Sequence, residues 1–410
     1  MIEFFRLKTI PEVLEITRRF MPLKVELIPL AKAYNRVLAE SITALEDVPE
    51  FSRSTMDGYA VRAQDTFGAS PGSPALLEVV GEVGMGEEPR VPLGPGQAQR
   101  LATGGMLPMD ADAVVMLEYT QELADRTLEV YRTVAPLENV VQRGEDVPAG
   151  TTLLHTGVRL RPQDIGLLAA LGVIEVKVYQ KPRVAIIASG DEITSIDVPL
   201  QMGQMRDANS YALAGQVAAM GGEPQLLGIV PDRLELLIEK MAVGLAETDL
   251  VLLSGGSSVG TRDLAIAAIR SFPQAEVLVH GVAISPGKPT ILARIGSQPI
   301  FGLPGHPVSA MVIMEVMVRP LLTCLAGESQ VRKDWGRTIK AVLSRNLAST
   351  IGREDFIRVR LCPAGGNMWA EPVLGKSGLI STMVKADGWI RIPLNTEGLE
   401  KGEEVEVILF

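Results

Sequence analysis

Residues 249–264, DLVLLSGGSSVGTRDL, constrain the fold more than any other stretch of this 410-residue chain. The apolar run at 250–254 is long enough for a buried parallel strand, and the glycines after it predict a tight loop before a helix. Backbone N–H groups in such a loop, at the carboxyl end of a strand, can form a cradle for an anion. The alternative is an ordinary turn in which Asp263 caps the helix.

The same order of strand, loop and helix recurs from residue 182 onwards. We expect strands at 184–188 and 225–230. We expect one helix at 209–220 and a second that begins near residue 232. A third helix should follow the Gly/Pro turn at 302–307 and end near residue 324. This alternation predicts a multidomain α/β protein built on an open, mostly parallel sheet. Ligands of such sheets bind at the carboxyl ends of the strands.

The remaining segments differ from the α/β part in their pattern of apolar and turn residues. Thr9 and Glu12 form a capping-box pattern that predicts a helix at 10–20, and we expect further helices at 30–40 and 162–171. Short apolar runs and turns predict β structure elsewhere. We therefore expect a helical linker domain (1–47 and 146–181), an inserted β-rich domain (48–145), the α/β domain (182–328) and a C-terminal β-barrel (329–410).

Composition excludes several classes of protein. A net charge of −10 argues against nonspecific binding of nucleic acid, so an anionic ligand needs a local basic pocket. Two distant cysteines and three histidines lack the spacing of a disulfide scaffold or a zinc site. With no run of about 20 uninterrupted apolar residues, we expect a cytoplasmic protein with no membrane partner.

Carboxylates follow the predicted strands and could converge at one edge of the sheet. They are Asp191, Glu192, Asp232 and Asp263. Carboxylates beside anion-binding loops suit a hard cation such as Mg²⁺, held partly by protein oxygens and partly by a bound phosphate. The alternative, that each caps a helix, stays open for Asp232, whereas two adjacent acids after Ser189-Gly190 suit no single cap.

Other polar residues lie in Gly/Pro turns. Lys288, between Gly287 and Pro289, is either a flexible surface lysine or a point charge for a phosphate, and we favour the second interpretation. The dipeptide Asp57-Gly58 is typical of a simple turn. His306 lies at a predicted helix start, which we favour over a role as general base.

Eight stretches in this order carry a family resemblance over about 300 residues. They are PEFSRSTMDGYAV, ATGGMLPMDADAVVMLE, RGEDVPAG, RPQDIGLLAALG, ASGDEI, SGGSSVGTRDL, PGKP and GLPGHPVSA. Together with the later segment SGLISTMVKADGWIRIP, they resemble the MoeA family, the molybdopterin molybdenumtransferases. The resemblance implies that the α/β domain is MogA-like and that Mg²⁺ supports insertion of molybdate into adenylylated molybdopterin with release of AMP.

The resemblance also implies the residues of the site. The catalytic set is Asp57, Thr103, Glu192 and Asp263, and the metal set is Asp191, Glu192 and Asp263. The substrate-binding set is Ser189, Gly190, Asp232, Gly255, Gly256, Ser257, Lys288, Pro304 and Gly305.

The expected partners are adenylylated molybdopterin, molybdate, a second copy of the chain that shares the active sites, and a MogA-like adenylyltransferase. Three departures from the family pattern stand out: Ser285 replaces a lysine, His306 replaces an asparagine, and residues 188–193 read ASGDEI in place of STGDEL. Loss of a lysine is expected to weaken a contact with an oxyanion. The alternatives are an adenylyltransferase of the MogA kind, against which the inserted domain and barrel argue, and a non-catalytic scaffold.

Overall fold

The computed structural model describes residues 7–255, 261–329 and 337–410, and only the backbone of residues 261–263. The chain divides into two compact units. One comprises Met1–Glu40, Thr156–Arg161 and Glu175–Phe410, and the other comprises Ser41–His155 and Pro162–Ile174. The finer division into four domains stays a prediction.

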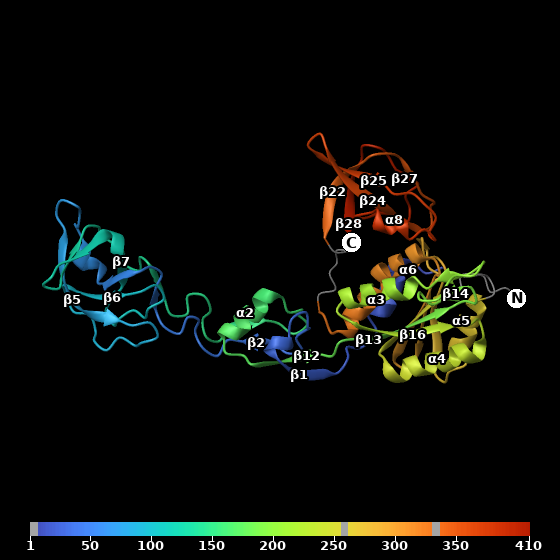
Figure 1. Ribbon diagram of the computed structural model, residues 1–410, viewed down its shortest axis with the longest axis horizontal. Helices are drawn as coiled ribbons and strands as arrows, with labels where there is room; N and C mark the ends of the chain where they lie inside the picture. Colours follow the sequence, from blue (N-terminus) through green and yellow to red (C-terminus); the bar gives the residue numbers. More distant parts are fainter. Residues whose placement is uncertain (1–6, 256–260, 330–336) are drawn as a thin grey trace. The chain divides into compact units, whose positions relative to one another are not determined.

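A six-stranded sheet forms the centre of the first unit (Figure 1). Its order is β16 (Glu223–Val230), β13 (Arg183–Ser189), β17 (Leu250–Gly255), β21 (Gln298–Leu303), β20 (Ile291–Ile295) and β18 (Ala275–His280). The first four strands are parallel to their neighbours, while β20 runs antiparallel to both β21 and β18. The predicted open, mostly parallel α/β sheet is confirmed.

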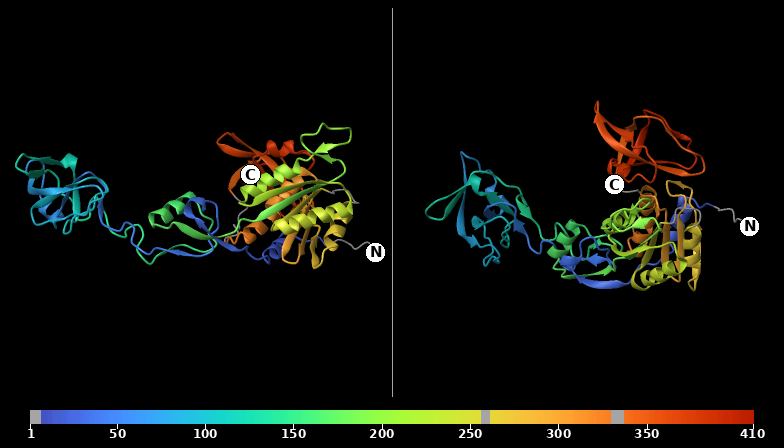
Figure 2. Two further views of the ribbon diagram at one scale, coloured as in Figure 1. Left: turned by 60° about the horizontal axis from the view of Figure 1, so that its bottom comes forward. Right: turned by 45° about the vertical axis from the view of Figure 1, so that its right-hand side comes forward.

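Helices cover both faces of this sheet because its central strands are apolar on both sides. In β13, Val184 and Ile186 pack into one core cluster, and Ala185 and Ile187 pack into another. The first cluster includes α1 (Ile10–Thr17), α3 (Asn209–Ala219), α6 (Pro307–Ile313) and α7 (Arg319–Leu325). The second includes α4 (Leu234–Glu247) and α5 (Thr261–Arg270), and Figure 2 shows α3 and α4 on opposite sides of the sheet.

Helices α6 and α7 join through a π-helical turn, η4 (Met314–Val318), into one apolar helix. This helix, Pro307–Leu325, has 19 residues and is long and apolar enough to cross a membrane. Glu315 and Arg319 interrupt its apolar sequence, so no uninterrupted apolar run indicated it. Within the protein, 67% of its most apolar window is buried. Its side chains fill the core beside the sheet, which accounts for their composition.

The N-terminal segment is partly as expected. Thr9 and Glu12 form the predicted capping box at the start of α1. The prediction of a helix at 30–40 is wrong, since only a 3₁₀ turn, η1 (Leu30–Lys32), forms there. Asn35 adopts a left-handed backbone conformation (φ 61°), and Val37 and Leu38 then form bridges with the distant residues Arg159 and Val178. Long-range pairing has overridden the local helical pattern.

The predicted C-terminal barrel is confirmed. Its strands pair in the closed order β24 (Glu354–Ala364), β25 (Asn367–Pro372), β22 (Thr338–Leu343), β28 (Glu404–Leu409) and β26 (Gly388–Ile392), which pairs again with β24. The short strand β19 (Ile284–Ser285) from the α/β part adds to β24. On the outer side of the barrel, Phe356, Trp389 and Ile408 join the core beside the large sheet. The barrel therefore packs directly on the α/β part.

The second unit is rich in β structure, as expected. Its main sheet has the order β7 (Ala113–Met116), β4 (Gly58–Val61), β6 (Gln97–Leu101), β5 (Ala75–Val83), β9 (Thr127–Val130) and β8 (Thr120–Glu122). It also contains η2 (Ala63–Thr66), η3 (Leu117–Tyr119), α2 (Pro162–Ala170) and the strand pairs β2 (Ile42–Thr43) with β11 (Thr152–Leu154) and β3 (Arg53–Ser54) with β10 (Val140–Val141).

Short elements complete the first unit. They are the pairs β1 (Val25–Pro29) with β12 (Glu175–Tyr179), β14 (Ile193–Thr194) with β15 (Met205–Arg206), and β23 (Leu347–Ala348) with β27 (Gly398–Leu399), and the helix α8 (Ser381–Val384).

Candidate functional site

The carboxyl ends of β13 and β16 bring three predicted site residues together. The hydroxyl of Ser189 donates a hydrogen bond to Oδ1 of Asp232 across 2.8 Å. The backbone N–H of Asp232 in turn donates to Oδ1 of Asp191 across 3.1 Å. Helix α4 begins only at Leu234 and has no side-chain cap, so Asp232 does not serve as the helix cap that was the alternative interpretation.

Two glycines let the backbone approach closely at this cluster. Gly255 ends β17 with φ +134°, and a Cβ placed there would lie 1.9 Å from the carbonyl oxygen of Ser189. A Cβ on Gly190 (φ +151°) would lie 2.8 Å from Oε2 of Glu192, so the Glu192 side chain folds back over that glycine. Only glycine fits at these positions without displacing its neighbours. Ser189, Gly190, Asp191, Glu192, Asp232 and Gly255 therefore form one site, which we call the sheet-end cluster.

The side chain of Asn209 links this edge of the sheet to the next turn. Its Nδ2 donates to the hydroxyl of Ser254, at the end of β17, and to the carbonyl oxygen of Gly305, both across 2.8 Å. Sequence reasoning did not single out Asn209, although its place at the start of a helix that follows a strand was a usable signal. Through Asn209, the predicted substrate residue Gly305 is tied to the strand ends.

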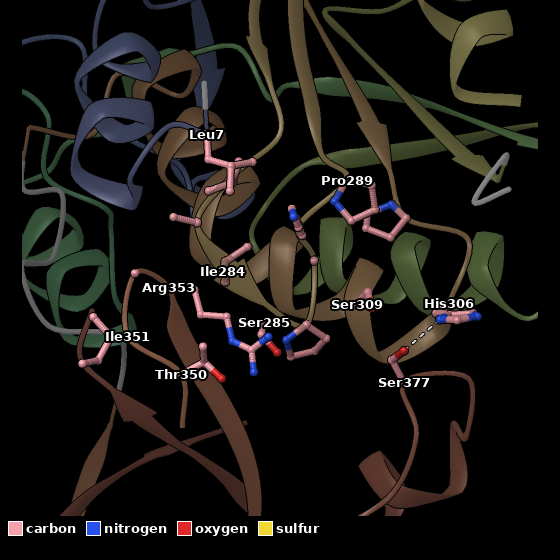
Figure 3. Close-up of a pocket in the computed structure, with 17 residues that line it drawn as sticks. Leu7, Ile284, Ser285, Pro289, His306, Ser309, Thr350, Ile351, Arg353 and Ser377 are labelled. Atoms are coloured by element: carbon pink, nitrogen blue, oxygen red, sulfur yellow. Dashed lines mark hydrogen bonds between the residues drawn. The ribbon is translucent and has the colours of Figure 1, made fainter. Parts of the chain in front are cut away.

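A cavity of about 730 Å³ lies beside the Pro304–Gly305 turn (Figure 3). Its walls come from residues 282–289, from the turn and first residues of α6, and from the barrel segment 350–353. Leu7 and Ser377 complete the lining. Of the predicted substrate residues, Lys288 and Pro304 line this cavity.

The charge of the cavity is positive. Lys288 is exposed to it, and Arg353 contributes a guanidinium whose Nε lies 3.2 Å from the buried carboxylate of Asp355. His306 adds an imidazole. No aspartate or glutamate belongs to the described lining residues. A basic cavity in a chain of net charge −10 favours an anion there.

The turn that carries Lys288 is held by its backbone. The carbonyl oxygen of Lys288 accepts from the N–H of Val282 across 2.9 Å. One residue earlier, the carbonyl oxygen of Gly287 accepts from the hydroxyl of Thr290 across 2.7 Å. A fixed turn with an exposed ammonium fits a point-charge contact to an anion better than a freely moving surface lysine.

Several cavity residues were not predicted because they come from the barrel, to which the sequence assigned no site residue. Arg353 and Ser377 belong to segments that precede β24 and α8. The family-like segment that begins at Ser377 was the signal that could have directed attention to this region. Figure 3 shows Arg353 and Ser285 among the residues that line the cavity, and the hydrogen bond between His306 and Ser377.

In the second unit, Asp57 and Thr103 contact each other directly. Oδ1 of Asp57 accepts from the backbone N–H of Thr103 across 2.7 Å and from its hydroxyl across 2.9 Å. The backbone hydrogen bond, followed by that of the hydroxyl, lowers the pKa of Asp57 below its usual value. The carboxylate is therefore held in its charged form and in one orientation at an exposed site.

Part of the predicted set cannot be placed. Gly256 and Ser257 lie outside the described residues, and for Asp263 only the backbone is described, in the first turn of α5. Among the residues whose side chains are described, no three His, Cys, Asp or Glu side chains form a group that could hold a metal ion. The predicted role of Asp263 in a metal site stays a prediction.

Comparison with known proteins covers nearly the whole chain. Residues 8–172 match the model of the MoeA N-terminal region (domain I and II), residues 185–323 match the "Probable molybdopterin binding domain", and residues 340–410 match the MoeA C-terminal region (domain IV).

Individual relatives agree with the family models. The molybdopterin molybdenumtransferases of Bacillus subtilis and of a Nostoc species are each 35% identical, over 94% and 93% of this chain and 90% and 88% of their own lengths. A crystal structure of the molybdopterin biosynthesis MoeA protein from Pyrococcus horikoshii is similar with a TM-score of 0.81 and 38% identity, covering 98% of this chain and 99% of that one.

Proposed function

This chain belongs to the MoeA family, and we propose that it inserts molybdate into adenylylated molybdopterin in a Mg²⁺-dependent step that releases AMP. Its relatives named molybdopterin molybdenumtransferase are 31–35% identical over most of its length. The chain is accordingly a molybdopterin molybdenumtransferase of molybdenum cofactor biosynthesis. The reaction steps and the roles of single residues are the proposal.

The observation that supports the proposal most strongly is the basic cavity. Lys288 and Arg353 supply positive charge, and the hydroxyls of Ser285 and Ser309 supply donors. Tetrahedral oxyanions are recognised by such combinations of charge and hydrogen-bond donors. We assign molybdate to this cavity, whose volume of about 730 Å³ also leaves room for the part of the pterin that receives the metal.

The sheet-end cluster suits the phosphate-bearing part of adenylylated molybdopterin. Gly190 follows β13 and Gly255 ends β17, at the edge where α/β sheets bind ligands. We assign the phosphate-bearing part of adenylylated molybdopterin to this edge. The hydrogen bonds of Asn209 to Ser254 and Gly305 give a structural link between the two parts of the substrate site.

The chemistry of the donor set fits Mg²⁺. Asp191 and Glu192 are exposed carboxylates beside the proposed phosphate position, and Mg²⁺ is commonly held by one or two carboxylates with waters and phosphate oxygens. In our proposal these two residues hold the ion, with Asp263 as a further ligand. Bound Mg²⁺ would stabilise charge on the leaving phosphate. Asp232, whose Oδ1 accepts from the hydroxyl of Ser189, would orient that serine in the substrate-binding part of the site.

We further propose a cytoplasmic homodimer in which the Asp57–Thr103 pair of one subunit completes the site of the other. The support is the fixed, exposed and charged carboxylate of Asp57, which no described side chain other than Thr103 contacts in the hydrogen bonds and ion pairs of this chain. A MogA-like adenylyltransferase would supply the adenylylated substrate. These partners follow from the family resemblance.

The test is a single-turnover reaction. Purified protein is incubated with adenylylated molybdopterin, Mg²⁺ and molybdate, and AMP and metallated cofactor are quantified. We expect both products in equal amounts, and neither without molybdate. Formation of adenylylated product from ATP and molybdopterin would instead favour the MogA-like alternative, and binding without AMP release would favour a scaffold.

A further inference from the structure

We propose that His306 is an anion-binding residue of the oxyanion cavity, whose imidazole tightens anion binding when it is protonated and then leaves the hydroxyl of Ser377 free to donate. The inference rests on the proposed function, because it assumes an oxyanion in the cavity. The sequence predicts His306 at a helix start, where it replaces an asparagine of the family pattern. Both side chains line the cavity.

The pair is geometrically defined. Nδ1 of His306 lies 2.8 Å from Oγ of Ser377. The backbone carbonyl of Ser377 accepts from the N–H of Val308 across 3.1 Å, so the serine is fixed against the same helix start that carries the histidine. The imidazole does not cap α6, since the N-cap makes no side-chain hydrogen bond. The His306–Ser377 pair is therefore available to the cavity.

The protonation state of the ring decides what Ser377 can offer. A neutral imidazole with a bare Nδ1 accepts a hydrogen bond from the hydroxyl of Ser377, and Oγ then presents only lone pairs to the cavity. An imidazolium must donate through Nδ1 to Oγ, which releases the hydroxyl proton for a bond to an anion. The neutral tautomer with its proton on Nδ1 also donates to Oγ, so protonation adds a donor relative to the tautomer with a bare Nδ1 and a positive charge relative to both. Both changes favour an oxyanion, so anion binding and proton uptake are coupled.

The other charged groups around the pair do not duplicate this effect. From the turn before β20 comes Lys288, and from the segment before β24 comes Arg353, whose charge is partly compensated by Asp355. Lys376 is exposed in the loop that carries Ser377. Lysine and arginine keep their charge around neutral pH, whereas histidine changes charge between about pH 5 and 8. Position 285 carries a neutral serine, so the conditional charge of His306 is a large fraction of the total.

The experiment measures binding of molybdate to the full chain by equilibrium dialysis, with sulfate as a second oxyanion. For the wild type we expect roughly fivefold tighter binding at about pH 6 than at about pH 8, as one added charge near an anion in a hydrated cavity would give. His306→Asn keeps a polar side chain that does not titrate and should remove this dependence. His155→Asn, at an exposed histidine of the other unit, is the matched control and should retain it.

Ser377→Ala separates the donor from the charge. It keeps the imidazole, so part of the pH dependence should remain, but affinity at the lower pH should fall below that of the wild type. Equal pH dependence in the wild type and His306→Asn would overturn the inference, as would a Ser377→Ala variant that matches the wild type at both pH values. Failure of the wild type to bind either oxyanion at any pH would instead contradict the proposed function.

Discussion

The hydroxyl of Ser189 donates to the carboxylate of Asp232 across 2.8 Å and so ties the end of β13 to the loop that follows β16. Ser189 is 9% exposed, and a hydrogen bond of this kind contributes about 1 kcal/mol to stability. We expect Ser189→Ala to lower the free energy of unfolding by about that amount and to raise the KM for adenylylated molybdopterin. Urea unfolding and steady-state kinetics check the two effects.

Ser195→Ala is the matched control, because Ser195 also donates to an aspartate, Asp197, but does so in an exposed loop. It should change stability by less than about 0.5 kcal/mol, as surface substitutions usually do. Equal effects of the two substitutions on stability and KM would show that the link between the strands has no special role.

Gly255→Ala tests the close approach of β17 to β13. The new Cβ would overlap the carbonyl of Ser189, and φ of +134° is unfavourable for alanine, so we expect a loss of at least about 2 kcal/mol and a loss of activity. Gly215→Ala, in α3 with nothing within 4 Å of the new Cβ, should stabilise the protein by about 0.5–1 kcal/mol. The reverse order of the two melting temperatures would contradict this account of the strand ends.

The phenol of Tyr59 gives a prediction at alkaline pH. Burial, and then its hydrogen bond to Glu122 across 2.6 Å, raise the pKa of Tyr59 to about 12. A group whose pKa is higher in the folded than in the unfolded chain stabilises the fold fully below the unfolded value of about 10, and this contribution is lost as pH rises towards 12.

Tyr59→Phe should therefore destabilise the protein by about 1 kcal/mol at neutral pH, from loss of the hydrogen bond. The difference from the wild type should shrink as the pH rises above about 10. Denaturant unfolding at a series of pH values measures it, with the exposed Tyr34→Phe as control. A difference that stays constant up to about pH 12 would contradict the assignment.

Two arginines of the barrel should respond differently to removal. Arg358 is 9% exposed, its Nη2 donates to the carbonyl of Gly375, and its Nε and Nη1 have no partner among the described residues. Burial lowers the pKa of Arg358 from its usual value. Arg391 instead pairs with Glu354, whose side chain is 4% exposed. Removing an uncompensated buried charge is often neutral, whereas breaking a buried pair is destabilising.

We expect Arg358→Met to change the free energy of unfolding by less than about 1 kcal/mol, and Arg391→Met to lower it by about 2–3 kcal/mol because Glu354 is left buried and unpaired. Thermal and urea unfolding of the full chain give the comparison. A larger loss for Arg358→Met would mean that its single bond to Gly375 contributes more than its burial costs.

The sequence predicted the α/β sheet well because the decisive signals are local. The apolar runs of β13 and β17 and the glycines after them specify buried strands and tight turns without reference to distant residues. The helix prediction for residues 30–40 was wrong because the decisive contacts there are distant in sequence. Val37 and Leu38 pair with Arg159 and Val178, more than 120 positions away. Local helical periodicity cannot report such pairing.

The site residues also divide into those that local sequence patterns predicted and those that depend on contacts between distant segments. Lys288 lies in a Gly/Pro turn and the sheet-end cluster lies at the ends of predicted strands. Both could therefore be proposed from spacing and family motifs. Arg353 and Ser377 reach the cavity only because the barrel packs on the α/β part, and Asn209 contributes through contacts to two separate loops. The contributions of Gly256, Ser257 and Asp263 stay predictions.

Binding of molybdate by a Lys288→Met variant tests the central claim, that the basic cavity receives the oxyanion. Because Lys288 is exposed in a fixed turn and has no ion-pair partner among the described residues, its charge is available to the ligand. We expect equilibrium dialysis at low salt to show molybdate binding at least about tenfold weaker than in the wild type, with a smaller difference at high salt. Lys401→Met, at an exposed lysine of the barrel outside the cavity, should bind as the wild type does, and equal affinities for all three proteins would contradict the account.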